Sequence, residues 1–284
     1  MTYDDVMKLA LERGFYFPSS EIYADAQAGF WEYGPSGVSL KNKFLELWRR
    51  ELVRRDKMIE IDGSQIMSKS VFDASGHLAS FADPIVRCKK CKSTHRADKI
   101  IVEVSQIEIP ESADLDEFDK TIVEKNIKCP KCNGDFENAK KFNMMFEVGI
   151  GPEGESAYLR PETCQSIFVD FPRIFKTMRG KLPLGIAQTG KSFRNEIAPR
   201  QSLLRLREFY QAEIEVFCNP AKLNDLGKFS EIKDTKIRVQ IDNEIKSMTC
   251  KEAVDSQTIP NEFVAYYLAI LAEFYEKTGI NMEK

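Results

Sequence analysis

Apolar residues recur at helical spacing in two long stretches of the chain. Between 37 and 58 they stand three or four positions apart, which predicts a long amphipathic helix. They are Leu40, Phe44, Leu47, Trp48 and Leu52. Residues 260–277 predict a second helix, with Pro260 near its first turn, where a missing N–H costs little. At the N-terminus, Thr2 and Asp5 have the spacing of a capping box that begins a helix.

Residues 182–218 show a period of two instead, which predicts an antiparallel hairpin. One face of the first arm would carry Gln188, Gly190, Ser192, Arg194 and Glu196. One face of the second arm would carry Arg207, Phe209, Gln211, Glu213 and Glu215, and its other face Tyr210, Ala212, Ile214 and Val216. The hairpin therefore has an apolar face for packing and a polar face rich in charge. Such a polar face fits a binding site, and it also fits a salt-bridged strand surface.

The stretch 86–141 differs from its surroundings. It has alternating strand character followed by an acidic run, and a C-x-x-C pair lies near each end. We interpret it as an inserted module, which divides the chain into 1–85, 86–141 and 142–284. From about 142 to 218 short strands dominate the pattern, and few signals of a helix are present.

The two cysteine pairs predict a metal site. Cys88 and Cys91 form one C-x-x-C pair, and Cys129 and Cys132 form the other, about 37 residues further on. Two such pairs offer four thiolates in a tetrahedral arrangement, which is what structural zinc takes, and no coordination position stays open for catalysis. An iron–sulfur centre and unligated cysteines are the alternatives, and His95 could replace one ligand.

Composition and charge exclude several classes of protein. A chain of 284 residues suggests one large domain, or one domain with a smaller insert. The net charge of -3 argues against a generally basic nucleic-acid coat. No apolar run approaches the roughly 20 residues of a membrane span, and the N-terminus lacks an apolar signal core. We therefore expect a cytoplasmic protein without membrane contact.

Several conspicuous residues have an ordinary structural interpretation. His77 fits a local hydrogen-bonding role, and the cysteines outside the two pairs fit small buried hydrophobes; these are Cys164, Cys218 and Cys250. The predicted helix over 37–58 carries a basic cluster that fits a solvated surface, with direct RNA contact as the alternative. The cluster consists of Arg49, Arg50, Arg54, Arg55 and Lys57.

Several segments together resemble the class II aminoacyl-tRNA synthetases. The series Phe193-Arg194-Asn195-Glu196, then Pro199 and Arg200, then Arg207-Glu208-Phe209 and Ala212-Glu213-Ile214-Glu215, resembles motif 2 of that class. Residues 33–44, YGPSGVSLKNKF, with the helix that follows, resemble motif 1. The residues in these motifs resemble those of the archaeal and eukaryotic glycyl-type enzymes. Further segments that resemble that type are SGH…FAD, Arg96-Ala97-Asp98 and residues 142–168. The likeness covers essentially the whole chain.

The resemblance implies an α+β fold with an antiparallel sheet flanked by helices, into which a zinc-ribbon-like module is inserted. It also implies a glycine–tRNA ligase that uses ATP with Mg²⁺ and forms a homodimer through the motif 1 region. Glycine would attack the α-phosphate of ATP, and the glycyl group would then pass to tRNA(Gly). No covalent enzyme intermediate is needed, so positioning and positive charge at the phosphate would carry the catalysis.

The resemblance also assigns roles to individual residues. Arg194 and Glu196 would be catalytic, with Arg194 at the α-phosphate, because a guanidinium binds two oxygens at once. The residues expected to contact ATP are Arg194, Asn195, Glu196, Arg205, Leu206 and Phe209, with Phe209 stacked on adenine. Glu162 and Glu213 would hold the ammonium group of glycine.

The chain also departs from the family pattern. It has no counterpart of the third motif, of the later glutamate and serine of the glycine pocket, or of the anticodon-binding domain. Motif 1 lacks its usual closing proline near Ile61–Ile66. We therefore expect a fragment or half of a split enzyme that is inactive by itself. A class II enzyme for another amino acid and a catalytically silent accessory subunit are the alternatives; Glu162 with Glu213 argues against the first.

Overall fold

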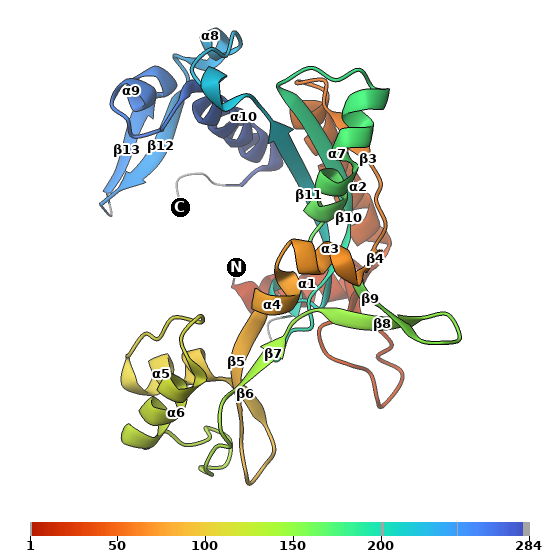
Figure 1. Cartoon of the computed structure of the whole chain (residues 1–284), viewed down its shortest axis with the longest axis vertical. Coiled ribbons are helices and arrows are strands. Elements are labelled where there is room, and N and C mark those ends of the chain that lie inside the picture. Colours follow the sequence, from red (N-terminus) through yellow and green to blue (C-terminus); the bar gives the residue numbers. More distant parts are fainter. Residues whose placement is uncertain (1, 200–201, 243, 281–284) are drawn as a thin grey trace.

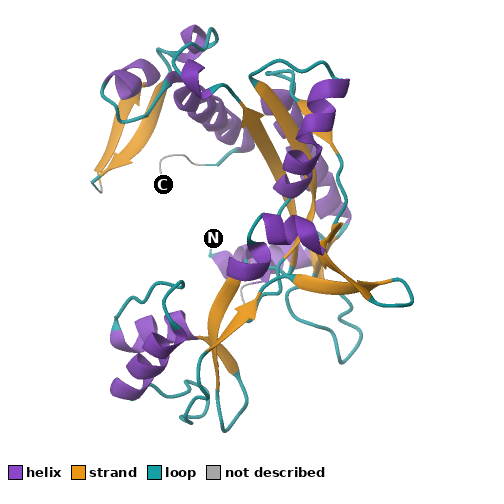
Figure 2. Cartoon of the chain, in the orientation of Figure 1, coloured by secondary structure: helices purple, strands orange, loops and turns teal. Residues whose placement is uncertain are grey.

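The computed structural model describes residues 2–199, 202–242 and 244–280. In Figure 1 the chain forms a C-shaped body, with the region around α5 and α6 at one end and the region of β12 and β13 at the other. None of the described helices is both long enough and apolar enough to cross a membrane. Figure 2 shows helices and strands in every part of the fold, and antiparallel pairing dominates the sheets.

The predicted hairpin is the longest pair of strands. β10 (Leu184–Phe193) and β11 (Glu208–Phe217) pair antiparallel along all ten residues of each strand. β3 (Ile59–Ile61) joins the other edge of β10 in parallel, so this sheet is not purely antiparallel as expected. α2 (Pro35–Trp48) and the π-helix that follows it (Arg49–Val53) precede β3. The predicted helix over 37–58 therefore exists, but it ends at Val53.

The two faces of the hairpin differ as predicted. Its apolar face packs Ala212, Ile214 and Val216 against a core that contains Trp48 and residues of α10 (Glu262–Thr278). The other face is apolar only where α7 (Cys164–Thr177) covers it, through contacts among Ile167, Ile174, Leu184 and Ile186. Beyond α7 the same face becomes polar, and the candidate site lies there.

Two helices correct the sequence interpretation. α7 lies in a region where short strands were expected, because Ile167, Phe171 and Ile174 recur at helical spacing. α5 (Ala97–Ser105) occupies the stretch predicted as strand; Ala97, Ile100 and Ile101 form its buried face. α5 packs against α6 (Leu115–Glu124), and both contribute to a core that lies wholly within residues 86–139.

The remaining elements are short. The three-stranded sheets are β4 (Ile66–Ser68), β9 (Glu155–Leu159) and β8 (Phe146–Ile150), and β6 (Thr94–Arg96), β5 (Ala82–Arg87) and β7 (Lys140–Asn143). The two-stranded sheets are β1 (Tyr16–Pro18) with β2 (Trp31–Tyr33), and β12 (Lys236–Ile241) with β13 (Glu244–Thr249). The other helices are α1 (Tyr3–Glu12), α3 (Lys69–Ala74), α4 (His77–Ser80), α8 (Phe229–Ile232) and α9 (Cys250–Asp255), with 3-10 turns at Ser202–Leu204 and Pro220–Lys222.

Capping explains where two helices begin. Thr2 and Asp5 form the predicted capping box of α1. α10 begins after Asn261, whose side chain accepts a hydrogen bond from the Val264 N–H, so Pro260 precedes the helix and does not lie in its first turn.

The basic cluster near the end of α2 is largely paired within the chain. Arg49 binds Glu60, Arg54 binds Glu46 and Arg55 binds Glu273, with N–O distances of 2.8, 2.7 and 2.5 Å. Arg50 binds Glu51. These ion pairs support the surface-charge interpretation over direct RNA contact.

Asp56 joins the end of this helical region to α10. Its carboxylate accepts hydrogen bonds from the hydroxyls of Tyr266 (2.7 Å) and Tyr267 (2.9 Å) and pairs with Lys228 (2.7 Å). The Asp56 side chain is only 6% exposed, so its loss would leave buried hydroxyls without an acceptor. Burial raises the pKa of both tyrosines, and the Asp56 charge raises it further.

We therefore expect Asp56→Ala to lower the free energy of unfolding by about 2–4 kcal/mol, the range for breaking a buried polar network. Urea denaturation followed by circular dichroism measures this loss. The control is Asp255→Ala, which removes an exposed ion pair with Lys251 and should change stability by less than about 1 kcal/mol. Equal losses in the two variants would contradict the assignment.

Candidate functional site

The polar end of the hairpin meets residues 160–163 and the segment around Phe81. Arg194 follows β10 directly, and its Nε donates a hydrogen bond to the carbonyl of Pro161 (3.2 Å). Its guanidinium lies between two rings, 5.3 Å from the centre of Phe209 and 5.6 Å from that of Phe81. Cation–π contacts with the two rings hold this group in place. Its two terminal nitrogens make no hydrogen bond within the described part of the chain.

Glu162 and Glu213 lie close to each other, and hydrogen bonds hold one oxygen of each carboxylate. Oε1 of Glu162 accepts hydrogen bonds from Gln165 Nε2 (2.7 Å) and Cys164 Sγ (3.0 Å). Oε2 of Glu213 accepts from the backbone N–H of Thr163 (3.1 Å) and from its hydroxyl. The second oxygen of each carboxylate receives no hydrogen bond from the described residues. Two fixed carboxylates, each with one oxygen to spare, suit a ligand that carries an ammonium group.

A third carboxylate strengthens the negative potential. Burial raises the pKa of Glu215, and the neighbouring charges of Glu213 and Glu162 raise it further. The carboxylates repel one another in this half-buried environment, so a cation that binds among them relieves the repulsion.

Arg160 lies beneath these carboxylates and is 1% exposed. Its Nε donates to the carbonyl of Lys191 (2.9 Å), and its Nη1 donates to that of Gly63 (3.0 Å). Burial lowers its pKa, although Asp62 and Glu213 oppose the shift. Gly190 makes room for it, since a Cβ at that position would lie 2.2 Å from Arg160 Nη2.

Further buried polar atoms lie on the same face of the hairpin, in α7 and at Arg160, which follows β9. They have no hydrogen-bond partner among the described residues, and they belong to Arg160, Gln165, Ser166, Gln188, Ser192 and Gln211. Buried polar groups without partners are uncommon in folded proteins and gather where a ligand or ordered water completes the site.

The predicted nucleotide residues are spread over neighbouring surfaces. The backbone N–H of Asn195 bonds to the carbonyl of Met144, and Glu196 lies 3.6 Å from Arg205. Glu196 and Arg205 line a cavity of about 190 Å³ together with Arg96, which binds Asp83, Asp98 and Glu111. Leu206 and Phe209 border a different cavity. The structure thus brings Arg194, Phe209, Glu162 and Glu213 into one neighbourhood. Glu196 and Arg205 lie together in the separate cavity of about 190 Å³.

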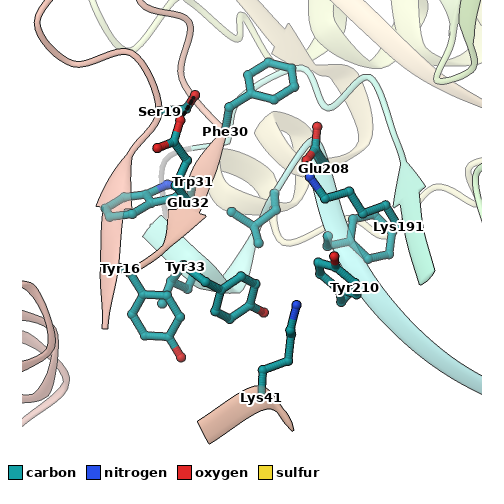
Figure 3. A pocket seen from close by; sticks show the side chains of 13 residues that line it. Tyr16, Ser19, Phe30, Trp31, Glu32, Tyr33, Lys41, Lys191, Glu208 and Tyr210 are labelled. Carbon is teal, nitrogen blue, oxygen red and sulfur yellow. Dashed lines mark hydrogen bonds and ion pairs between the residues drawn. The ribbon is translucent and has the colours of Figure 1, made fainter. Parts of the chain in front are cut away.

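That second cavity, of about 350 Å³, lies at the end of the hairpin where Lys191 pairs with Tyr210, and both Phe209 and Tyr210 of β11 border it (Figure 3). Lys191 and Tyr210, which face each other across the two strands, line it together with rings from β1 and β2. The Lys41 ammonium lies 3.9 Å from the ring centre of Tyr210 and 5.2 Å from that of Tyr33. Lys191 pairs with Glu208.

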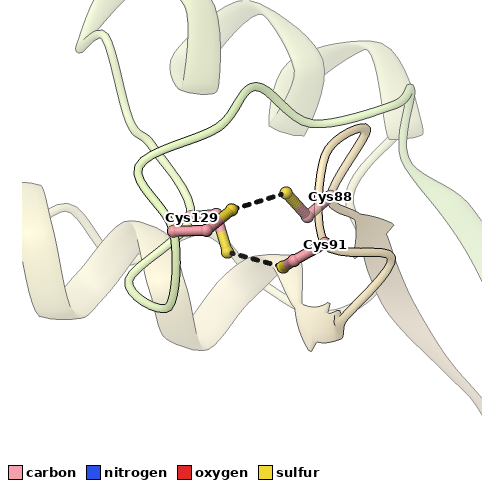
Figure 4. Close-up of side chains that lie close together, drawn as sticks. Cys88, Cys91 and Cys129 are labelled. Carbon is pink, nitrogen blue, oxygen red and sulfur yellow. Dashed lines mark hydrogen bonds between the residues drawn. The ribbon is translucent and has the colours of Figure 1, made fainter.

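The four predicted metal ligands converge in one place (Figure 4). Their sulfur atoms all lie within 4.8 Å of one another; Cys88 is 3.4 Å from Cys132, and Cys91 is 3.7 Å from Cys129. A tetrahedral zinc site with bonds of about 2.3 Å has sulfur atoms about 3.8 Å apart, so the arrangement fits. A hydrogen bond with Ser93 lowers the pKa of Cys91 to about 6, whereas burial raises the pKa of Cys132 to about 11. His95 is not one of the four converging groups, but its Nε2 lies 2.9 Å from the Ser93 hydroxyl oxygen and 3.8 Å from the sulfur of Cys129.

Sequence reasoning missed some contacts of the site. It treated Cys164 as a small buried hydrophobe, but the thiol is only half-buried and bonds to Glu162, and burial raises its pKa. Cys250 is buried in the core, as predicted. Arg160 and Thr163 were not singled out, because their partners Gly63 and Glu213 lie far away in the sequence.

Comparison with known proteins identifies the class. The family model described as the tRNA synthetase class II core domain (G, H, P, S and T) matches residues 142–237. These residues contain the hairpin, Arg194 and both fixed carboxylates. This part of the chain therefore carries the core domain of the class II aminoacyl-tRNA synthetases.

Curated relatives narrow this assignment. The chain is 44% identical to a glycine–tRNA ligase of Pyrococcus abyssi, over 99% of this chain and 50% of that protein. It is 41% identical to those of Methanothrix thermoacetophila and Methanococcus maripaludis, over 99% of this chain and 49% and 51% of the relatives. Within its class the chain belongs to the glycyl-tRNA synthetases of archaeal type. It spans about half the length of these relatives.

Proposed function

We propose that this chain forms the ATP- and glycine-binding part of a glycine–tRNA ligase. The protein activates glycine with ATP and Mg²⁺ to glycyl-adenylate and transfers the glycyl group to tRNA(Gly). The observation that carries the proposal is the pair of carboxylates of Glu162 and Glu213. Hydrogen bonds hold one oxygen of each carboxylate, and Arg194, which contacts the ring of Phe209, lies nearby. The relatives named glycine–tRNA ligase support the choice of amino acid.

The carboxylate pair receives the ammonium group of glycine. Each carboxylate keeps one oxygen without a hydrogen bond from the described residues, and Glu215 adds to the negative potential. Excluding a larger substrate by steric contact requires no separate editing site.

Arg194 lies where it can bind the reacting α-phosphate. The carbonyl of Pro161, next to Glu162, anchors it, so the glycine site and the arginine share one short segment. Its free terminal nitrogens suit two phosphate oxygens at once. Phe209 stacks on adenine, and Asn195, Glu196, Arg205 and Leu206 contact the rest of the nucleotide. Glu196 acts with Arg194 in catalysis.

We expect Arg194→Ala to reduce glycine-dependent ATP–pyrophosphate exchange by at least about 100-fold, the effect of removing a key transition-state donor. The assay uses the natural protein that carries this sequence. The control is Arg173→Ala on the exposed surface of α7, where the arginine is 77% exposed and pairs with Asp170. A loss confined to tRNA affinity, with exchange intact, would contradict the role.

The cysteine cluster holds a structural zinc ion. It belongs to a zinc-ribbon-like module over 86–141, which is inserted between the two parts of the catalytic domain, 1–85 and 142–284. Four sulfur ligands close the coordination sphere, so zinc stabilises the module and takes no part in the reaction. The separate core of this region supports its treatment as a module.

We expect elemental analysis to find about one zinc ion per chain, as a closed four-thiolate site requires. Cys129→Ser should increase proteolysis within 86–141 more than in the hairpin, because metal binding supplies folding energy to a small module. Cys218→Ser is the control outside the cluster. Protein without zinc, in which all four thiols react in the native state, would refute the site.

The protein works as a homodimer through the motif 1 region and in the cytoplasm. Val38 and Leu40 on α2, and Val6 and Leu9 on α1, are 40–52% exposed, which leaves an apolar surface for a second copy to cover. The described cysteines are all free thiols, which fits a reducing compartment.

A further inference from the structure

His77 lies at the edge of the carboxylate pair and has no part in the function proposed above. It begins α4, and its Nε2 lies 3.3 Å from Oε1 of Glu162. Its Nδ1 lies 2.8 Å from the hydroxyl oxygen of Ser75. The imidazole therefore bridges a serine and a carboxylate. The hydrogen bond with Ser75 confirms the local role expected for His77, and the contact with Glu162 goes beyond it.

The surroundings hold the imidazole ring in place. The rings of Phe72 and Phe81 pack against it edge to face, with centroid distances of 6.2 and 5.5 Å. The side-chain amide of Asn143 donates to the backbone carbonyls of His77 (3.4 Å) and Leu78 (2.9 Å). Phe81 also lies under the Arg194 guanidinium. His77 thus contacts Glu162 directly and reaches Arg194 through a single ring.

Hydrogen-bonding capacity determines which nitrogen of His77 carries the proton. An ionised carboxylate only accepts, whereas a serine hydroxyl donates or accepts. In neutral His77, a proton on Nε2 satisfies Glu162, and the Ser75 hydroxyl then donates to Nδ1. The opposite tautomer would place two lone pairs, on Nε2 and Oε1, against each other. The 3.3 Å separation is long for a hydrogen bond, as such contacts often are before substrate binds.

We infer that His77 is a positioning residue: its Nε2–H binds Oε1 of Glu162 and so reserves Oε2 for the ammonium group of the substrate. Gln165 and Cys164 bind the same Oε1, and the described residues give no hydrogen bond to Oε2. The inference rests on the proposed glycine site. The contact itself is a property of this chain and can be measured without any activity.

The first experiment measures the tautomer in the 284-residue chain. The sequence contains only two histidines, His77 and His95, so His95→Gln leaves a single set of imidazole signals to assign. Long-range ¹H–¹⁵N NMR at alkaline pH, where imidazole is neutral, should show His77 protonated at Nε2. Glu162→Gln should shift the Nε2 signal, and Ser75→Ala should weaken the preference for this tautomer. A proton on Nδ1, or an Nε2 signal unchanged by Glu162→Gln, would overturn the inference.

The second experiment measures glycine-dependent ATP–pyrophosphate exchange in the natural protein that carries this sequence. His77→Phe keeps a ring between Phe72 and Phe81 but removes the donor. It should raise KM for glycine about 10-fold, the worth of one hydrogen bond to a charged group. Both kcat and KM for ATP should stay within about threefold, because the lost contact acts on substrate binding alone. His77→Gln, which retains an N–H near Nε2, should restore most of the affinity, and His95→Gln is the control.

The outcomes separate the inference from the proposed function. An unchanged KM for glycine in His77→Phe, or equal increases in KM for glycine and ATP, would refute the positioning role. A wild-type protein without glycine-dependent exchange would refute the proposed function. In that case the tautomer and its response to Glu162→Gln still decide whether His77 orients this carboxylate.

Discussion

The register between β10 and β11 is the constraint on which the rest of the site depends. It places Gln188 opposite Glu213 and Ser192 opposite Phe209, so one face of the hairpin brings these side chains together. Successive side chains of a strand point to opposite faces, and a slip of one residue would bury Glu213 against the core of α10. The apolar residues on the other face prevent that slip, because Ala212, Ile214 and Val216 must pack against that core. Hydrophobic burial on one face thereby fixes the chemistry on the other.

Repulsion among the carboxylates is the second constraint, and the choice of their hydrogen-bond partners determines how the site accommodates it. Glu162, Glu213 and Glu215 repel one another, yet Arg160 beneath them does not bind them directly; its hydrogen bonds go to backbone carbonyls. A direct ion pair would neutralise the carboxylates and occupy the oxygens that a ligand needs. Hydrogen bonds from neutral groups, such as Thr163 and Gln165, orient the carboxylates without cancelling their charge. The negative potential thus remains available to an incoming cation.

Regular patterns in the sequence predicted the parts of the fold that they encode locally. The alternation over 182–218 predicted the hairpin and both of its faces, and the spacing of the cysteines predicted their convergence. The strand character assigned to the stretch that begins at Ile100 was wrong where α5 forms, because three apolar residues in a row fit either period until their partners on α6 are known. His77 and Arg160 could not be found this way. Their partners, Glu162 and Gly63, stand more than 80 residues away, and no local pattern records such contacts.

The parts of the site are joined by polar contacts and lie between separate hydrophobic cores. One core packs α2 and α10 against the hairpin, and another lies wholly within residues 86–139. Phe81 directly precedes β5, the strand that leads into the second core, and the carbonyl of Pro161 anchors Arg194 from a different segment. A substitution in either core can therefore destabilise the protein without changing the distances within the site. Conversely, the loss of one hydrogen bond can displace Glu162 while both cores stay intact, because hydrogen bonds from Cys164 and Gln165 hold that carboxylate. Stability and function are thus separable here. A substitution among the polar residues between the cores should change the kinetics without lowering the stability.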